Sequence, residues 1–373
     1  MRFSFVLAFA LPVLGQGPIC RALFDKIPGS TGNQHIGFVI DVSTSMEDND
    51  PNNLRLNTTR EIIKKLLPAS QASGNATADM AAVVDFAGTP KVLYALGDPS
   101  GAEEVLHDPL TLRPSTFIGG GINKAVSELN GTASSAKLGI LVLTDGYDDP
   151  QSGVTETIAA IKAAGSQGIR VSFAFLAVDS KIKQDQRIVD AILTTGGTFG
   201  TVSNDVDIAK VAGQILANGL TGPADESKAL KVIPGVETAA RLSETGPRTF
   251  TYSALSGEAF NVTATPIKNA TDLRITLKDG GDSELAVSEF DASENKAVVK
   301  YTAGKDMEVK ILVEGGRIGG NSTDRTFFLK VESALDVCAT KTPPLVIPGG
   351  ASTMGGYVGV AIGVSLFAML VVL

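Results

Sequence analysis

The chain has 373 residues, a length that suggests two ordinary domains rather than one. Hydrophobic residues make up 43% and charged residues 19%, so a packed core is expected and disorder along the whole chain is excluded. The formal net charge of −8 repels phosphate backbones, which argues against nucleic acid as a partner.

The first residues have the features of a secretory signal peptide. Met1 and Arg2 precede an apolar run from Phe3 to Leu14, and the small residue Gly15 follows. The run is too short to cross a bilayer comfortably, since a spanning helix takes about 20 residues. We therefore expect cleavage of a signal peptide at residues 1–15, with an N-terminal arm at 16–34; the alternative is an uncleaved anchor.

Strands alternate with helices over residues 35–220. Apolar runs predict strands at Ile36–Asp41, Met80–Phe86, Val92–Leu96, Leu138–Thr144, Val171–Val178 and Thr198–Val202. Helical spacing predicts helices at Leu54–Leu67, Gly121–Leu129, Val154–Ala164, Gln184–Thr194 and Asp205–Leu216, the last with Asn204 as its N-cap. The short turn at 87–90 makes the second and third strands an antiparallel edge hairpin. This order predicts an α/β fold with a doubly wound, mainly parallel sheet and one antiparallel edge strand.

Short strand-like segments replace this alternation over residues 224–336. They are Thr249–Ser253, Ala259–Pro266, Asp272–Lys278, Glu284–Glu289, Ala297–Tyr301, Glu308–Val313 and Thr326–Val331. Turn signals separate them, which predicts an antiparallel β-sandwich. Through the Ser256-Gly257-Glu258 and Asp272-Leu273 segments and the closing strands, this region weakly resembles pre-peptidase C-terminal β-sandwich domains.

The C-terminal end has the features of a membrane attachment signal. Pro, Thr and Gly at 337–356 indicate a stalk, and the apolar segment 357–373 runs to the last residue with no basic residue after Lys341. Small residues at Gly349 and Gly350 resemble a glycosylphosphatidylinositol (GPI) attachment site, whose hydrophobic tail is removed. The alternative is a single spanning helix without a cytoplasmic tail.

Cysteine and asparagine usage agrees with export. The only two cysteines, Cys20 and Cys338, are too far apart in sequence for a clustered thiolate zinc site. We expect them to form a disulfide; free or intermolecular thiols are the alternative. Six Asn-x-Ser/Thr sequons predict N-glycosylation at Asn57, Asn75, Asn130, Asn261, Asn269 and Asn321, although Asn57 falls within a predicted helix.

Oxygen-bearing side chains follow the buried strands of the first region. Asp41 ends the first strand and Ser43 and Ser45 follow it, and Asp145 comes directly after the strand at 138–144. Thr116 lies between them in the chain, just before a helix. Because ligands bind at the carboxyl ends of strands in doubly wound sheets, we expect the five side chains to converge. The alternative is that the serines only cap helices and the two Asp residues are solvated.

These motifs, Asp-x-Ser-x-Ser, Thr-x-x-Gly and Thr-Asp-Gly in this order, resemble the metal-ion-dependent adhesion site of von Willebrand factor A domains. The resemblance covers residues 35–220 and implies that Ser43, Ser45 and Thr116 bind a metal directly, with Asp41 and Asp145 near it. Hard oxygen ligands suit Mg²⁺, or Ca²⁺ or Mn²⁺, and not Zn²⁺. Glu47 and Asp48 resemble part of the integrin β-subunit stretch that binds a second, regulatory Ca²⁺, but Asn49 stands where that pattern has an acid.

The sequence does not favour an enzyme. It has two histidines, His35 and His107, and lacks the His-Glu-x-x-His and Gly-x-Ser-x-Gly motifs. Asp148 is the one candidate general base beside the metal, and we expect it to be exposed.

The function expected from all these features is that of a surface-anchored extracellular adhesion or ligand-binding protein. It would bind an Asp or Glu side chain of a partner protein through the metal. The alternatives are a structural wall or matrix protein in which the metal only stabilises loops, and a metal-assisted hydrolase.

Overall fold

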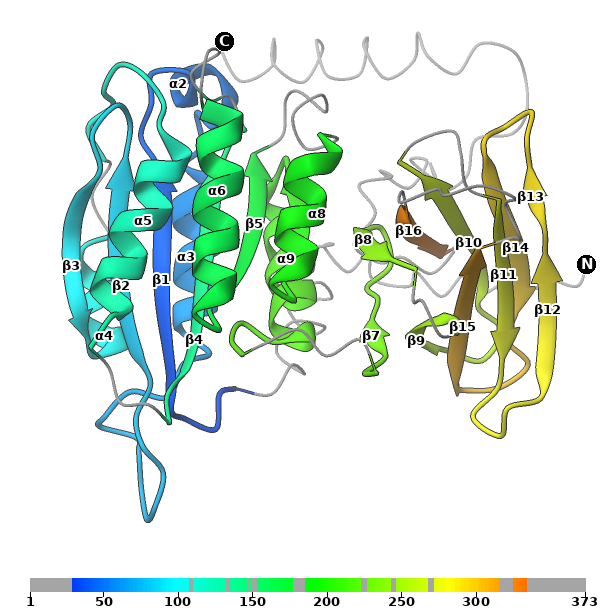
Figure 1. Ribbon diagram of the computed structural model, residues 1–373. Helices are drawn as coiled ribbons and strands as arrows, with labels where there is room; N and C mark the ends of the chain where they lie inside the picture. Colours follow the sequence, from blue (N-terminus) through cyan, green and yellow to red (C-terminus); the bar gives the residue numbers. More distant parts are fainter. Residues whose placement is uncertain are drawn as a thin grey trace, which may run out of the picture. The chain divides into compact units, whose positions relative to one another are not determined.

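The computed structural model describes residues 29–333 except 107–109, 132–134, 147, 149–152, 177–184, 223–226, 243–245, 268–271 and 316–324. Within these residues the first sheet has the strand order β3-β2-β1-β4-β5-β6 (Figure 1). Its strands are β1 (Gln34–Asp41), β2 (Met80–Phe86), β3 (Lys91–Gly97), β4 (Lys137–Thr144), β5 (Arg170–Leu176) and β6 (Phe199–Val202). All neighbouring pairs are parallel except β2 and β3. The predicted mainly parallel sheet with one antiparallel edge strand is confirmed.

Helices cover both faces of this sheet, because successive side chains of its central strands point to opposite faces. Phe38 of β1 packs in one core with α3 (Leu54–Ile63), α4 (Pro99–Glu104) and α9 (Asp205–Asn218). Val39, its neighbour, packs in a second core with α5 (Ile118–Leu129), α6 (Gly153–Ser166) and α8 (Gln186–Thr194). Figure 1 shows α5, α6 and α8 side by side over one face. The doubly wound arrangement follows directly from this two-sided burial.

Helices α3 and α5 differ most from their predictions at one end. Helix α5 begins at Ile118 instead of Gly121, because its glycines fit where larger residues do not: a Cβ on Gly121 would lie 2.8 Å from Val39 Cγ1. Helix α3 ends at Ile63 instead of Leu67. Pro68 disfavours a helical conformation for the residue before it, and the Leu67 amide instead donates to Asp79 Oδ2 at 2.7 Å. Asn204 caps α9 as predicted, accepting from the Val206 and Asp207 amides.

Two further sheets form a β-sandwich around their own core. One has the order β13-β14-β10-β16-β8 and the other β12-β11-β15-β9-β7. Their strands are β7 (Leu230–Lys231), β8 (Glu237–Arg241), β9 (Arg248–Ala254), β10 (Ala259–Pro266), β11 (Leu273–Lys278), β12 (Glu284–Ser288), β13 (Phe290–Asp291), β14 (Lys296–Thr302), β15 (Met307–Gly315) and β16 (Thr326–Ser333). The described pairings are antiparallel apart from the short contact between β7 and β9. The predicted antiparallel sandwich is confirmed, and three of its strands, β7, β8 and β13, have no predicted counterpart.

Several predicted features fall wholly or partly outside the described residues. They are the signal peptide, Cys20 and Cys338, Asn269 and Asn321, Gly349 and Gly350, and the stalk and tail. No helix within the described ranges has the length and hydropathy needed to traverse a bilayer. Of the described sequons, Asn75 and Asn130 are exposed, whereas Asn57 within α3 and Asn261 within β10 are half-buried.

Candidate metal site

Asp41 connects the first loop of the site, which carries Ser43 and Ser45, to the neighbouring strand β4. It is the last residue of β1 and is 0% exposed to solvent. Its Oδ1 accepts a hydrogen bond from the Ser43 amide at 2.8 Å, and its Oδ2 accepts one from the Thr144 hydroxyl at 2.6 Å. Thr144 is the last residue of β4, which pairs with β1 in parallel. The carboxyl ends of the two central strands are therefore held together at one edge of the sheet.

The two serines of the first loop bring their hydroxyls together. Ser43 Oγ and Ser45 Oγ lie 3.0 Å apart, and Ser43 is 2% exposed. Ser45 occupies the N-cap position of α2 (Met46–Asn49), but its side chain makes no capping hydrogen bond. Thr44, between them, is exposed. The serine hydroxyls thus do not serve as the helix caps that the alternative interpretation requires.

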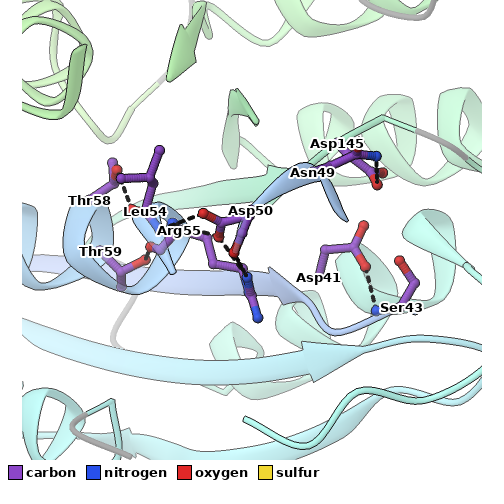
Figure 2. A network of polar contacts seen from close by, with 9 residues as sticks. All are labelled: Asp41, Ser43, Asn49, Asp50, Leu54, Arg55, Thr58, Thr59 and Asp145. Carbon is purple, nitrogen blue, oxygen red and sulfur yellow. Dashed lines mark hydrogen bonds and ion pairs between the residues drawn. The ribbon is translucent and has the colours of Figure 1, made fainter. Parts of the chain in front are cut away.

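Asp145 supplies the second carboxylate at the same edge. It follows β4, is 3% exposed, and its Oδ2 accepts a hydrogen bond from Asn49 Nδ2 at 2.9 Å (Figure 2). The turn after it is tight, because Gly146 has a φ of 87° and its amide donates to Thr144 Oγ1 at 3.0 Å. A side chain at Gly146 would be strained at that φ. Asp145 is therefore buried and oriented, not solvated.

The electrostatics of the two carboxylates favour a cation. The pKa of Asp41 is raised to about 7: burial is the largest cause, the nearby Asp145 charge acts in the same direction, and hydrogen bonds from Ser43 and Thr144 partly oppose them. Among the described residues no three His, Cys, Asp or Glu side chains cluster as metal ligands. The chain thus offers two buried acids with neutral hydroxyls beside them, which is the donor set of a hard divalent cation.

The second loop, which carries Thr116, runs beside the first. The Arg113 amide donates to the Val42 carbonyl at 2.8 Å, and Arg113 pairs with Ser43 in an isolated parallel bridge. The Arg113 guanidinium forms an ion pair with Asp85 of β2 and donates to the Thr89 carbonyl at 2.9 Å. These contacts place the loop of the half-buried Thr116 next to the first loop.

Ser115 has an unusual backbone conformation immediately before Thr116. Its φ of 65° lies in the left-handed region, which few residues other than glycine adopt. Gly88 makes room for it, since a Cβ on Gly88 would lie 3.1 Å from Ser115 Cβ. Such strain, which costs about 1–3 kcal/mol, tends to occur where a loop is held in a functional shape. Here it sets the direction in which the chain reaches Thr116.

Asp148 is half-buried, so the expectation that it is exposed is wrong. Its Oδ2 accepts a hydrogen bond from the Thr157 hydroxyl of α6 at 2.7 Å, and its Oδ1 accepts a longer one from the Ile118 amide at 3.4 Å. Ile118 is the first residue of α5. Asp148 therefore fastens the start of α5, just after Thr116, to α6. This structural use does not favour its role as a general base.

The other predicted acids are open to solvent. Glu47 and Asp48 are exposed in the first turn of α2. Asn49 stands at the acid position of the second-metal pattern, and its side-chain amide donates to Asp145. A second metal at Glu47 and Asp48 stays a prediction.

A buried ion pair between Asp50 and Arg55 follows α2 and connects it to α3. Asp50 Oδ1 accepts from the Leu54 amide at 2.6 Å, and Asp50 Oδ2 accepts from the Arg55 guanidinium at 2.6 Å and the Arg55 amide at 3.1 Å (Figure 2). The two side chains are 0% and 2% exposed, respectively. Asp50 thus serves as the anchor for the first turn of α3, and through it α3 is fixed to the end of α2.

Comparison with known proteins finds a family model that matches the first region of the chain. The family model of the von Willebrand factor type A domain matches residues 35–211, a span that contains all five predicted metal-site residues. Comparison with curated proteins gives no match.

Among solved structures, BatB from Bacteroides thetaiotaomicron is similar at 20% identity, over 49% of this chain and 97% of that chain, with a TM-score of 0.38. Proximal thread matrix protein 1 from the mussel byssus, with zinc in its MIDAS motif, is similar at 21% identity over 52% and 48% of the two chains, with a TM-score of 0.41. Manganese-loaded TRAP from Plasmodium vivax is similar at 12% identity over 42% and 62%, with a TM-score of 0.35.

Proposed function

Residues 35–211 form a von Willebrand factor type A domain, and from this premise we propose that the protein is an extracellular adhesion or ligand-binding protein that uses a divalent cation to bind a partner's carboxylate. Such domains commonly serve in adhesion or ligand binding. The observation that carries the proposal is the pair of buried acids, Asp41 at 0% and Asp145 at 3% exposure, beside the two serine hydroxyls. Burying charge without compensation is costly, and a cation supplies the compensation.

The roles of the residues follow from their positions. Ser43, Ser45 and Thr116 would hold the ion directly through neutral hydroxyls, with Asp41 and Asp145 close to it. Mg²⁺ is the proposed ion, with Ca²⁺ or Mn²⁺ as alternatives, since all three prefer oxygen ligands. When bound, the ion supplies positive charge and an open coordination position to which an Asp or Glu of a partner protein can bind. Thr144 and Asn49 would orient the two carboxylates through the hydrogen bonds that they donate to Asp41 and Asp145, respectively.

The sequence signals at the two ends support the proposed location. An N-terminal signal peptide with cleavage after residue 15 would export the chain, and the C-terminal segment 357–373 would attach it to the outer face of the plasma membrane, by a GPI anchor at Gly349 or Gly350 or as a spanning helix.

The test uses the full-length protein and matched variants within one loop. Titration calorimetry with Mg²⁺ or Mn²⁺ is expected to show one ion bound per chain, and an immobilised Glu-containing peptide should be retained with the metal and released by EDTA. Ser43→Ala should abolish metal binding and peptide retention. Thr44→Ala, which removes an exposed hydroxyl one residue away, should abolish neither metal binding nor peptide retention. Undiminished peptide binding in EDTA would contradict the proposal.

A structural role for the metal is the second candidate. Both oxygens of Asp41 already fasten the site, one to the Ser43 amide and one to the Thr144 hydroxyl. A metal that only stabilises these loops would raise the melting temperature of the protein without changing its affinity for any carboxylate. Measuring both quantities on one preparation separates the two functions.

A further inference from the structure

The side chain of Asn49 connects the end of α2 to Asp145, the residue that follows β4. Its Nδ2 donates to Asp145 Oδ2 at 2.9 Å across 96 residues of sequence (Figure 2). A hydrogen bond to a charged group in a buried setting is among the stronger ones. One oxygen of Asp145 is thus held by the protein at the edge where the predicted metal ligands gather.

The backbone around Asn49 fixes the position of its side chain. The backbone amide of Asn49 donates to the Ser45 carbonyl at 3.1 Å, and the backbone amide of Asp50 donates to the Met46 carbonyl at 3.0 Å. At the start of α2, Met46 is buried at 1% exposure, and after its end Asp50 is bound to Arg55 and the start of α3. The side-chain amide of Asn49 therefore reaches Asp145 from a short helix that is held at both ends.

The chemistry of the amide matters as much as its position. Asn49 is neutral, so the two site acids, Asp41 and Asp145, balance the charge of a divalent cation and leave the site without excess negative charge. An acid at position 49 would add a third negative charge beside Asp145. Such a site would bind a cation more strongly and would repel an incoming carboxylate, because like charges at close range oppose binding.

We propose that Asn49 is a positioning and specificity-determining residue: it orients Asp145 by a hydrogen bond, and its neutrality allows the loaded site to accept an anionic partner group. This inference rests on the proposed function of the site. It assigns Asn49 a role distinct from that of an incomplete second metal site.

The experiment compares Asn49→Ala, Asn49→Asp and the control Thr44→Asp, which adds a charge at an exposed position of the same loop. Calorimetry with Mn²⁺ and retention of a Glu-containing peptide are measured on the full chain. Asn49→Ala should weaken Mn²⁺ binding by roughly 10-fold, as expected for loss of a hydrogen bond to a charged group. Asn49→Asp should bind Mn²⁺ at least as tightly as the wild type yet lose peptide binding, and Thr44→Asp should change both by less than about threefold.

A metal-free measurement separates failure of this inference from failure of the proposed function. In EDTA, Asn49→Asp should melt at a lower temperature than Asn49→Ala, because two carboxylates then face each other, whereas Thr44→Asp should melt close to the wild type. If the wild type binds no Mn²⁺ but this difference in melting temperature is present, the proposed function fails and the positioning contact stands. If both variants match the wild type in Mn²⁺ affinity, peptide retention and metal-free melting, the role of Asn49 is refuted.

Discussion

Replacing Arg55 by Met should destabilise the region around the metal site by several kcal/mol. Arg55 and Asp50 form an ion pair at 2.6 Å with side chains 2% and 0% exposed. Removing one partner of a buried pair typically costs about 3–5 kcal/mol, because the other charge stays buried without compensation. Asp50 would keep its hydrogen bonds from the Leu54 and Arg55 amides, so the lower end, about 3 kcal/mol, is expected.

Hydrogen exchange followed by mass spectrometry on the full chain in EDTA measures this loss locally, in peptides that cover α3. The double variant Asp50→Asn/Arg55→Met removes both charges and should recover at least 1 kcal/mol of the loss. The control is Arg187→Met, which breaks an ion pair with Asp185 whose arginine is 65% exposed, and it should cost less than about 0.5 kcal/mol. A loss below 1 kcal/mol for Arg55→Met, or a double variant that is no more stable than Arg55→Met, would refute the reasoning.

Three further outcomes are expected. Because burial raises the pKa of Asp41 to about 7, the metal-free folded state retains a proton that the unfolded chain releases near pH 4, so this carboxyl's contribution to stability is lost as the pH rises from about 4 to 7. Urea unfolding at several pH values should show that the unfolding free energy of the wild type falls by up to about 4 kcal/mol over this range, and that of Asp41→Asn should not fall in this way. Equal pH profiles for the two proteins would contradict the assignment. Ser115 has a φ of 65°, so Ser115→Val should lower the unfolding free energy by about 1–3 kcal/mol and Ser115→Gly by less than about 1 kcal/mol; similar melting temperatures for the two variants would argue against strain there. Peptide mapping of secreted protein should find glycans at the exposed Asn75 and Asn130, and full occupancy of the half-buried Asn57 would contradict the burial of α3.

The parts of the fold that could be predicted are those in which burial imposes a period on the sequence. The central strands β1, β4 and β5 are buried on both faces and read as continuous apolar runs. The sandwich strand β10 alternates between buried and half-buried residues, which gave its limits correctly. Helix α4 and strand β7 were missed because six and two residues are too few to show a period.

The placement of the two site carboxylates at one edge of the sheet was predictable, and the contacts that orient them were not. Asp41 and Asp145 lie at strand ends, and the topology rule brings such ends to one edge of the sheet. The orienting contacts come from residues that bind a segment distant in sequence, namely Asn49, Thr144 and Arg113. A single sequence does not indicate which distant segments lie side by side. Asp148 was misjudged for the same reason, since its partners Thr157 and Ile118 lie on two different helices.

The anomalous signal of Mn²⁺ in a crystal of the intact protein tests the central claim most directly. One peak is expected at the carboxyl ends of β1 and β4, with the hydroxyls of Ser43, Ser45 and Thr116 around it and the carboxylates of Asp41 and Asp145 nearby. A Mn²⁺-soaked crystal with no peak at this edge of the sheet, or with these five side chains directed away from one another, would contradict it.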